Sequence, residues 1–384
     1  MKITAIEAIP FNLPPRRDFK WAGLAGSLGR FVLVRVRTDA GLTGYGEATP
    51  QPDWGGDYGR RNGETQLSVV NTVTESLAPA LIGQDPLNVT AASSRMDAAI
   101  VGHSYAKCAV DMALHDIAGK AAGLPLYKLL GGAVRESVAV AHMVGLMPEA
   151  DALEEAAGAI ADGIGALQIK GGVDPARDIR LIAALRSELG DAVKLRLDAN
   201  QGYRHVKTAV GVVEALHGSG LDFIEQPVEG LRNMAEVTRQ VHVPVIADET
   251  CWNAADALDL VAARGADCIS IYLAKAGGFV GARRVAAIAD AAGLRCDVNG
   301  SIESAIGNAA NVHFALAMSC VSLPAVIPVS APAGQHTCKI GGHYFEDDVI
   351  AEAFPIANGN LLPLDKPGLG IEIDEAKLDR YCAK

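Results

Sequence analysis

The sequence predicts an α/β protein in which a barrel of parallel strands follows a smaller α+β capping domain. From about residue 138 onward, short β-rich runs alternate with Ala- and Leu-rich helical segments, which is the pattern of parallel strands joined by crossover helices. The number of these units favours a closed barrel over an open doubly wound sheet. With 384 residues, 49% of them hydrophobic, the chain can bury one large core and a second, smaller one.

Residues 1–130 are predicted to form the capping domain. Residues 31–37 are a run of β-favouring side chains, an Asp-Ala-Gly turn signal follows, and residues 44–47 begin the next strand, so a β-meander opens the chain. From residue 65 onward the pattern is helical, and the Ala-rich stretch 109–122 stops at Gly123-Leu124-Pro125. This alternation of strands and helices predicts an α+β cap.

The barrel is predicted over residues 131–346. The tail from about residue 347 to residue 384 contains several Pro and Gly residues, and we expect it to be short and irregular, to pack back on the cap and to complete it. The helices of the barrel are expected at residues 152–161, 176–189, 206–216, 234–240, 254–263, 282–292 and 305–318.

Five predicted strands of the barrel end in a charged residue. In parallel barrels the catalytic groups lie at the C-terminal ends of successive strands, so these charges should converge on one mouth. Any one carboxylate in such a place would more often be a surface or capping residue, but three in register between two lysines predict a site. The five residues, spaced 28, 27, 23 and 27 positions apart, are Lys170, Asp198, Glu225, Asp248 and Lys275.

The three carboxylates suit a divalent cation. Mg²⁺, with Mn²⁺ as an alternative ion, prefers oxygen ligands, and Asp198, Glu225 and Asp248 would supply them. Bound there, the ion could bridge to a substrate carboxylate and stabilise the negative charge that develops when the α-proton leaves. Asn200 and Glu249 are then candidates for orienting these ligands or the substrate.

The two lysines are predicted to be acid/base groups. A lysine acts as a base only when it loses its proton, which burial or neighbouring cations favour by depressing the pKa. Lys170 and Lys275 fall on the second and sixth predicted strands, across the barrel from each other. That arrangement suits a reaction in which one lysine removes a proton and the other returns one to the opposite face. The alternative is that one of them is only an electrostatic partner of the enolate.

Charge and composition exclude several classes of protein. The net charge is −11 and there is no basic stripe with interleaved aromatic residues, so nucleic acid and anionic membrane surfaces are poor candidates for partners. No run of about 18 apolar residues appears and the first residues enter a strand pattern directly, from which we expect a cytoplasmic protein. The seven scattered cysteines contain no C-x-x-C pair and are expected to be buried thiols, Cys251 included.

Ten short motifs occur in an order that resembles the mandelate racemase/muconate lactonizing enzyme family of the enolase superfamily, in particular its muconate-lactonizing subgroup. The resemblance covers nearly the whole chain, and the ordered set is specific although no single motif is. The motifs lie at residues 44–47, 109–113, 123–125, 130–132, 169–172, 198–200, 225–227, 248–249, 275–278 and 302–304.

The resemblance implies the detailed architecture and chemistry. It implies a cap domain, a modified (β/α)7β TIM-type barrel, Mg²⁺ on Asp198, Glu225 and Asp248, and Lys170 with Lys275 as the acid/base pair. It also implies a homo-oligomer, since the family is typically oligomeric.

Two positions depart from the family pattern. The subgroup usually has Lys-x-Lys on the second strand, whereas Gln168 stands at the first of these positions here, which removes a positive charge beside the substrate carboxylate. His115 stands where the family tends to have tryptophan before Asp116, and we interpret His115 as a packing residue. The loss of the lysine leaves the substrate class open.

The family resemblance also implies two cap loops that close over the mouth. Residues 19–24 and 50–58 are the candidates, rich in glycine and aromatic residues. Trp21, Trp54 and Tyr58 would present faces to a cation or an apolar ring, or else anchor the lid itself.

Acidic residues near the predicted mouth suggest a cationic substrate. Asp297 and Glu303 flank the seventh predicted strand, and two further aspartates lie in the lid. We therefore expect a substrate with a carboxylate and an ammonium group, such as an amino acid or a proline derivative. Residues 102–107, together with residues 111–113, resemble the same stretch of enzymes of this subgroup that epimerise hydroxyproline betaine or dehydrate hydroxyproline.

The sequence thus predicts an enolising isomerase that acts on a small-molecule carboxylate. The lysine pair favours a racemase or epimerase. A muconate-type cycloisomerase (lactonizing) and a dehydratase of a hydroxylated carboxylate remain alternatives, because they share the first step. A non-catalytic binding barrel is a remote alternative, since all five charged positions are filled, and the lack of a histidine-rich cluster argues against a metal-dependent hydrolase.

Overall fold

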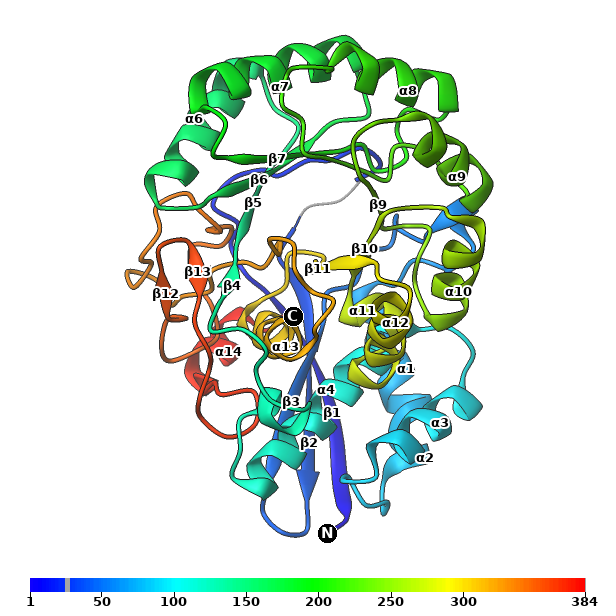
Figure 1. The fold of residues 1–384 in the computed structure, drawn as a ribbon. Coiled ribbons are helices and arrows are strands. Elements are labelled where there is room, and N and C mark those ends of the chain that lie inside the picture. The colour runs from blue at the N-terminus through cyan, green and yellow to red at the C-terminus, as the bar shows by residue number, and fades with distance from the viewer. Residues whose placement is uncertain (25–27, 384) are drawn as a thin grey trace.

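The computed structural model describes residues 1–24 and 28–383 of the chain (Figure 1). The chain opens with a three-stranded antiparallel sheet, β1 (Ile3–Asn12), β2 (Arg30–Thr38) and β3 (Thr43–Ala48), so the predicted meander is confirmed. The helices that follow in the capping part are α1 (Gln66–Thr72), α2 (Ala78–Leu81), α3 (Val89–Ala99), α4 (Ser104–Ala122) and α5 (Leu126–Leu129), with a π-helical turn at Val73–Leu77 and a 3₁₀ turn at Asp57–Gly59.

Helix α4 packs very closely on strand β3. A Cβ atom on Gly44 would lie 2.1 Å from the carbonyl oxygen of Ala113, and one on Gly46 would lie 1.9 Å from that of Ala109. Only glycine permits this approach of strand to helix. His115, on the same helix, is buried and lies against the ring of Phe279 with 4.8 Å between ring centroids, which is the packing role predicted for it.

The second part of the chain is a parallel sheet in the order β11-β10-β9-β8-β7-β6-β5 (Figure 1). Its strands are β5 (Ala141–Val144), β6 (Ala166–Lys170), β7 (Lys194–Asp198), β8 (Phe223–Glu225), β9 (Val245–Ala247), β10 (Cys268–Ile271) and β11 (Arg295–Val298). Around it lie α6 (Glu149–Ala161), α7 (Pro175–Leu189), α8 (Val206–Ala215), α9 (Leu231–Gln240), α10 (Ala254–Ala263), α12 (Phe279–Ala291) and α13 (Ala305–Ala317). The α/β barrel class and its alternating elements are confirmed.

Residues 320–326 close the barrel without forming a regular strand. Cys296 of β11 bridges Val321, and Val140 bridges Ala325, both in parallel. The backbone N–H of Val326 also donates to the carbonyl of Val298 at 3.1 Å. This segment therefore takes the place of an eighth strand.

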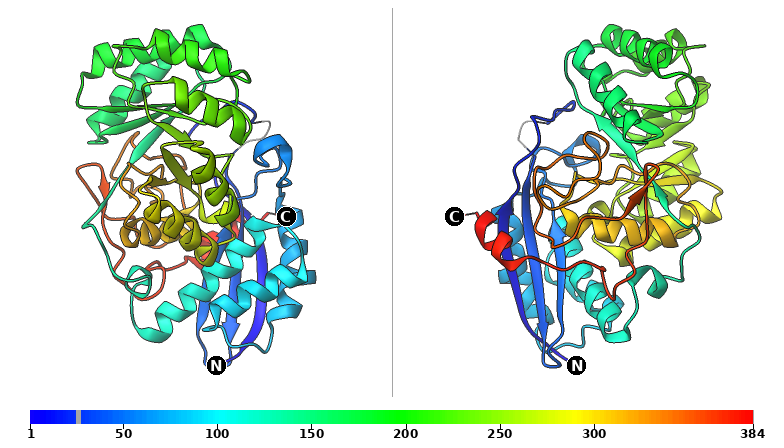
Figure 2. Two further views of the ribbon diagram at one scale, coloured as in Figure 1. Left: turned by 45° about the vertical axis from the view of Figure 1, so that its right-hand side comes forward. Right: turned by 90° about the vertical axis from the view of Figure 1, so that its left-hand side faces the viewer.

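The C-terminal segment returns to the first strands (Figure 2). Phe11 of β1 bridges Cys382, and Arg35 of β2 forms an ion pair with Glu375 at the start of α14 (Glu375–Tyr381). The prediction of a wholly irregular tail is wrong, because β12 (Ile356–Ala357) and β13 (Asn360–Leu361) pair with β4 (Val138–Ala139) before α14 begins.

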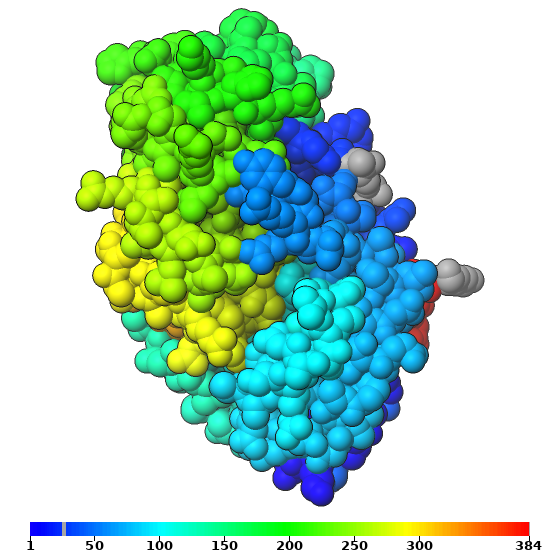
Figure 3. All heavy atoms as spheres, turned by 90° about the vertical axis from the view of Figure 1, so that its right-hand side faces the viewer, coloured from blue at the N-terminus to red at the C-terminus, as the bar shows by residue number. Residues whose placement is uncertain are grey.

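On the face shown in Figure 3, cap atoms, blue to cyan, pack directly against the green and yellow atoms of the barrel. None of the helices in the described part of the chain has the length and apolarity needed to cross a bilayer.

Candidate active site

The charged residues predicted to converge do lie at one end of the barrel. Lys170 is in register with Asp198 across β6 and β7, and Asp198 is in register with Glu225 across β7 and β8. Asp248 follows the last residue of β9 directly. All four side chains are buried.

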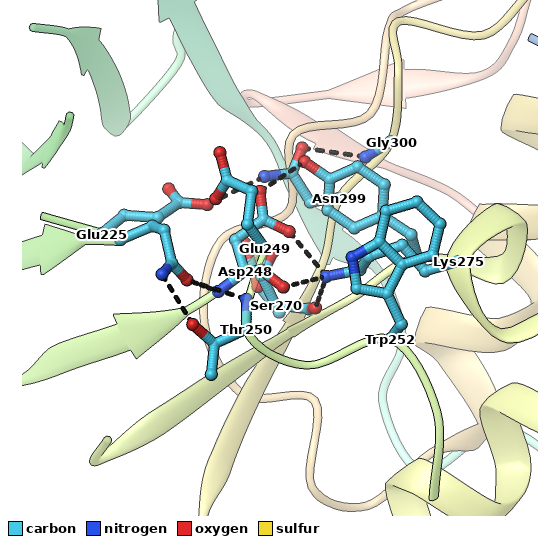
Figure 4. A network of polar contacts seen from close by, with 12 residues as sticks. Glu225, Asp248, Glu249, Thr250, Trp252, Ser270, Lys275, Asn299 and Gly300 are labelled. Carbon is cyan, nitrogen blue, oxygen red and sulfur yellow. Dashed lines mark hydrogen bonds and ion pairs between the residues drawn. The ribbon is translucent and has the colours of Figure 1, made fainter. Parts of the chain in front are cut away.

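Lys275 reaches the same place by a different route. Strand β10 ends at Ile271, and Lys275 lies in the short helix α11 (Leu273–Ala276). Figure 4 shows its Nζ turned back to the strand ends, where it donates to Asp248 Oδ1 at 2.6 Å, to the Asp248 carbonyl at 2.8 Å and to the Ser270 carbonyl at 2.8 Å. The expectation that Lys275 terminates a strand is therefore wrong, although its placement at the mouth is right.

The two lysines have matching environments. Lys170 Nζ donates to Asp198 Oδ2 at 2.6 Å and to Asn200 Oδ1 at 3.2 Å, as Lys275 Nζ does to Asp248. Burial lowers the pKa of Lys170, but the facing carboxylates, Asp198 first and Glu225 next, raise it above its usual value. The depressed lysine pKa that we predicted is not found here. A cation held by the same carboxylates would offset their charge, leaving burial to favour the neutral amine.

The site as a whole carries an excess of negative charge. Three buried cations face five buried carboxylates, which leaves two uncompensated negative charges, as many as one divalent cation would neutralise. The residues are Lys170, Arg196 and Lys275 against Asp198, Glu225, Asp248, Glu249 and Asp297.

Two carboxylates show the effect of this excess. Burial raises the pKa of Glu225 to about 8, Arg196 opposes the shift, and Asp198 adds to it by repulsion. Glu249 Oε1 accepts from Asn200 at 3.1 Å, whereas its Oε2 is buried without a hydrogen-bond partner among the described residues. The available ligand atoms are carboxylate oxygens, and their negative charge exceeds the positive charge around them. Both properties fit a Mg²⁺-like ion.

The side chains of the three carboxylates nevertheless do not converge on one point, as the ligands of a bound metal ion would. Across residues 1–24 and 28–383, no three His, Cys, Asp or Glu side chains converge in the manner of a metal site. Instead Gln168 Nε2 bridges two of them, donating to Asp198 Oδ2 at 3.1 Å and to Glu225 Oε2 at 2.8 Å. The metal set therefore stays a prediction, and Gln168 lies directly beside it, where the family has a lysine.

A small cavity of about 30 Å³ opens beside these groups. Both lid tryptophans contribute to it. Lys170 Nζ lies 5.6 Å from the ring centroid of Trp21, and Lys275 Nζ lies 6.0 Å from that of Trp54 and 4.3 Å from that of Tyr272. The residues lining the cavity are Trp21, Gln51, Trp54, Met143, Gln168, Lys170, Asn200, Asp248, Tyr272, Asn299, Gly300, Ser301, Ile302 and Val326.

Three residues predicted to contact a substrate do not line this cavity. Tyr58 is 56% exposed and lies under Arg60, 5.1 Å from ring to guanidinium carbon. Asp297 is buried and forms an ion pair with Arg196 at 2.5 Å, so it supports the carboxylates from the barrel interior. Glu303 is buried and accepts from the backbone of Ser301 at 2.9 Å. Asp297 and Glu303 are therefore not part of this cavity wall, and their role toward a substrate ammonium group stays a prediction.

Other residues of the site were not predicted from the sequence. Arg196 lies two positions before Asp198 on β7, so the alternation of side chains along a strand could have placed it on the same inner face. Tyr272 donates its hydroxyl to Asp248 Oδ2 at 3.0 Å. Gln51 lay within the predicted lid but was not singled out. Burial raises the pKa of Cys251 to about 12, in keeping with an inert thiol.

A buried ion cluster fixes the loop that carries Trp21. Glu155 Oε1, on α6, accepts from Arg16 Nη2 at 2.6 Å, from Arg17 Nη2 at 2.9 Å and from His142 Nε2 at 3.1 Å. Arg17 also lies 3.8 Å over the ring of Phe19. Despite burial, these donors hold the pKa of Glu155 well below its usual range.

Replacing Glu155 by glutamine is expected to destabilise the fold by about 1 to 3 kcal/mol, because two partly buried guanidinium groups would lose their counter-charge. The free energy of unfolding in urea measures this. Glu154→Gln, at the exposed neighbouring position of the same helix, is the matched control and should have little effect. Equal stability of the two variants would contradict the assignment of Glu155 as the anchor of the loop.

Buried carboxylates between the cap and α13 predict a pH-dependent stability. Burial raises the pKa of Glu303 to about 8 and that of Asp348 to about 8, and Glu47 adds repulsion to both. A carboxyl group whose pKa is raised by folding stabilises the fold fully below its unfolded pKa and loses that contribution as the pH rises through the folded value. The thermal midpoint should therefore decrease as the pH is raised from about 5 to about 9. The free energy of unfolding should decrease by at most about 1.4 kcal/mol per pH unit for each group.

Glu303→Gln should flatten that slope, because the amide cannot ionise and still offers an oxygen to the Ser301 N–H. Asp379→Asn, at an exposed position of α14, is the control and should keep the wild-type slope. Thermal unfolding followed by circular dichroism at several pH values tests both. An unchanged slope in Glu303→Gln would contradict this account.

Comparison with known proteins places the chain among enzymes. A family model described as "Enolase C-terminal domain-like" matches residues 151–377, and one described as "Mandelate racemase / muconate lactonizing enzyme, N-terminal domain" matches residues 6–131. The solved structure of the N-succinyl Arg/Lys racemase from Bacillus cereus superposes with a TM-score of 0.90 at 30% identity and covers 100% of this chain and 99% of that one. A muconate lactonizing enzyme from Pseudomonas fluorescens, complexed with muconolactone, gives the same TM-score at 30% identity, covering 100% and 99%.

Curated relatives are similar over most of the chain. The N-succinyl-L-Arg/Lys racemase of Bacillus cereus is 31% identical over 98% of this chain and 97% of its own length. An L-Ala-D/L-Glu epimerase of Bacillus subtilis is 36% identical over 82% and 85%, and a cis-3-hydroxy-L-proline dehydratase of Roseibium aggregatum is 33% identical over 97% and 96%. The chain belongs to the mandelate racemase/muconate lactonizing enzyme family of the enolase superfamily, as an isomerase whose relatives are mainly racemases, epimerases and cycloisomerases.

Proposed function

We propose that this protein is a divalent-metal-dependent racemase or epimerase of an amino-acid or proline-type carboxylate. The observation that carries the proposal is the matched placement of Lys170 and Lys275. Each lysine has its Nζ 2.6 Å from a carboxylate of the same cluster, and they approach from elements separated by β7, β8 and β9. A substrate bound over the cluster would have one lysine Nζ on each side of its α-carbon.

Each group of residues has its own role in the proposed reaction. Asp198, Glu225 and Asp248 would hold Mg²⁺, which supplies positive charge for the substrate carboxylate as the α-proton leaves. One lysine takes the α-proton as a neutral amine, and the other, still protonated, delivers its proton to the opposite face. Asn200 Oδ1 and the Ser270 carbonyl orient the two Nζ atoms, and Trp21 and Trp54 keep water away from them.

Proton exchange tests the proposal. Both stereoisomers of each amino acid, proline derivative, betaine and lactone of a panel are incubated in D₂O with Mg²⁺, and with EDTA as the control, and the α-proton is followed by NMR. A racemase or epimerase exchanges the α-proton of both stereoisomers and interconverts them, in Mg²⁺ only. Loss of water or formation of a lactone would instead assign the dehydratase or cycloisomerase alternative. Exchange that persists in EDTA would contradict the metal assignment.

A further inference from the structure

A second and larger cavity, of about 490 Å³, lies between the cap and the barrel. It is on the side of the molecule that faces the viewer in Figure 3, where cyan atoms of the cap meet yellow atoms of the barrel. Its walls come from the loop before α1, the junction of α3 with α4, the starts of α10 and α12, and α11. It shares no lining residue with the cavity beside the lysines. Its volume is in the range of sites that hold small organic molecules.

Lys107 is a buried cation in the wall of this cavity. It is 7% exposed, and its Nζ donates to Asp97 Oδ1 at 2.8 Å. An ammonium group has three N–H donors, and no other described residue accepts from the remaining two. Burial of a charged donor is costly when its hydrogen bonds are not completed. The free donors of Lys107 therefore point to an acceptor that a ligand in the cavity supplies.

Two further cations line the same cavity. Arg284, on α12, makes no ion pair or hydrogen bond with a described residue, and Arg61 Nη2 donates to Asp256 Oδ2 at 2.6 Å. Lys275 also borders the cavity, but its ammonium group is bound by Asp248 and is not counted here. Against three cations the wall carries one acid, Asp97, so two positive charges remain, or one if Asp256 is counted as well. In a chain with a net charge of −11, this local excess favours an anionic ligand.

The remaining wall offers hydrogen-bond donors and apolar surface. Ser104 Oγ donates to no described residue, and Asn253 uses its Oδ1 to cap α10, which leaves its Nδ2 free among the described residues. Trp252, Ala255 and Ala276 contribute apolar surface. The cavity therefore suits a ligand with an anionic end and an organic body.

We propose that this cavity is a binding site for a small organic phosphate monoester, separate from the active site. A phosphate monoester carries about −1.5 to −2 charge at pH 7 and has three terminal acceptor oxygens. Each of the three cations then receives one oxygen, whereas a carboxylate offers only two. The inference does not depend on the proposed function, because none of these cations belongs to the carboxylate cluster.

Titration calorimetry of the whole protein tests the ligand class. The probes are ribose 5-phosphate and glycerol 3-phosphate, with inorganic phosphate, ribose and citrate for comparison. EDTA is present throughout, so that no metal ion holds a phosphate at the active site. We expect at least one monoester to bind about tenfold more tightly than inorganic phosphate and citrate, more weakly at higher salt, and ribose not to bind. No binding of either monoester at millimolar concentration, or tighter binding of ribose or citrate, overturns the proposal.

Charge variants assign the binding to this cavity. Arg284→Gln and Lys107→Met should each weaken the monoester about tenfold, because each removes a charge-assisted hydrogen bond. Asp97→Asn should strengthen it, because it removes the opposing charge. Arg283→Gln, at the exposed neighbouring position outside the cavity, is the matched control and should keep the wild-type affinity. Thermal unfolding shows that each variant is folded, and Arg284 is itself exposed, so its replacement leaves the fold intact. Wild-type affinity in Arg284→Gln and Lys107→Met overturns the proposal.

Hydrogen–deuterium exchange locates the ligand independently. The N–H groups of Ala276 and Gly277 in the cavity wall donate to carbonyls at 3.3 Å each, long bonds that a ligand packed against them would protect. Ribose 5-phosphate or glycerol 3-phosphate, whichever binds, should slow exchange in residues 101–107 and 275–284, and this protection should be lost in Lys107→Met. Protection of the strand ends around Asp198 and Glu225 instead would place the ligand in the active site and overturn the proposal.

Discussion

Lys275→Ala is expected to abolish α-proton exchange from one stereoisomer of the substrate and to retain it from the other, and Lys170→Ala is expected to show the opposite selectivity. Each lysine faces one side of the position above the carboxylate cluster, so each can reach the proton of only one configuration. Loss of a positioned general base typically costs about 10²- to 10⁴-fold in rate. Racemisation, which requires both lysines, should fall by this factor in either variant.

The measurement is exchange in D₂O by NMR, started separately from each stereoisomer. Lys194→Ala is the matched control, because Lys194 also forms an ion pair with an aspartate, Asp222 at 2.8 Å, but at the opposite end of β7. Lys194→Ala should exchange the α-proton of both stereoisomers at the wild-type rate. If both catalytic-lysine variants lose exchange from both stereoisomers alike, one lysine is the only base and the other acts through charge, which was the alternative left open by the sequence.

Regular elements were predictable from the sequence because local pattern determines them. The helix expected at residues 254–263 is α10, and that expected at 176–189 is α7 with one further residue. Lys170, Asp198 and Glu225 could be placed because a strand ends where its apolar run ends, and parallel strands align those ends. The convergence of these residues therefore follows from pattern and topology alone.

Features that depend on tertiary contacts were not predictable. The run before Lys275 looks like one strand, but it divides into β10 and α11 because the chain turns back toward Asp248. Residues 320–326 close the barrel through backbone bonds that leave no β-pattern in their side chains. Asp297 looked accessible at a strand end, whereas its partner Arg196 comes from a strand about 100 residues earlier. Only the fold brings these groups together.

Glu225→Gln is expected to remove metal-dependent activity and, at the same time, to stabilise the protein in EDTA. Glu225 is fully buried among carboxylates, and burial raises its pKa to about 8, so its charge is costly to the fold without a cation. Glutamine relieves that repulsion and keeps an oxygen for Gln168 Nε2, while it gives up the acceptor for Asn299 Nδ2, whose bond is the longer of the two at 3.4 Å. The wild type should gain about 2.7 kcal/mol when Mg²⁺ is present at about 100 times its dissociation constant. The variant should gain little, because it has lost a ligand.

Thermal unfolding in EDTA and in Mg²⁺, together with proton exchange, separates these effects. Glu188→Gln, at an exposed position on α7, is the control and should match the wild type in both conditions. The expected pattern is a higher midpoint for Glu225→Gln in EDTA, a smaller Mg²⁺-induced increase and loss of exchange. A lower midpoint in EDTA would mean that the ion pair of Glu225 with Arg196 outweighs repulsion by Asp198 and Asp248. An undiminished increase in the midpoint with Mg²⁺ would place the ion elsewhere and remove Glu225 from the predicted ligand set, because loss of a ligand must weaken the binding of the ion that it holds.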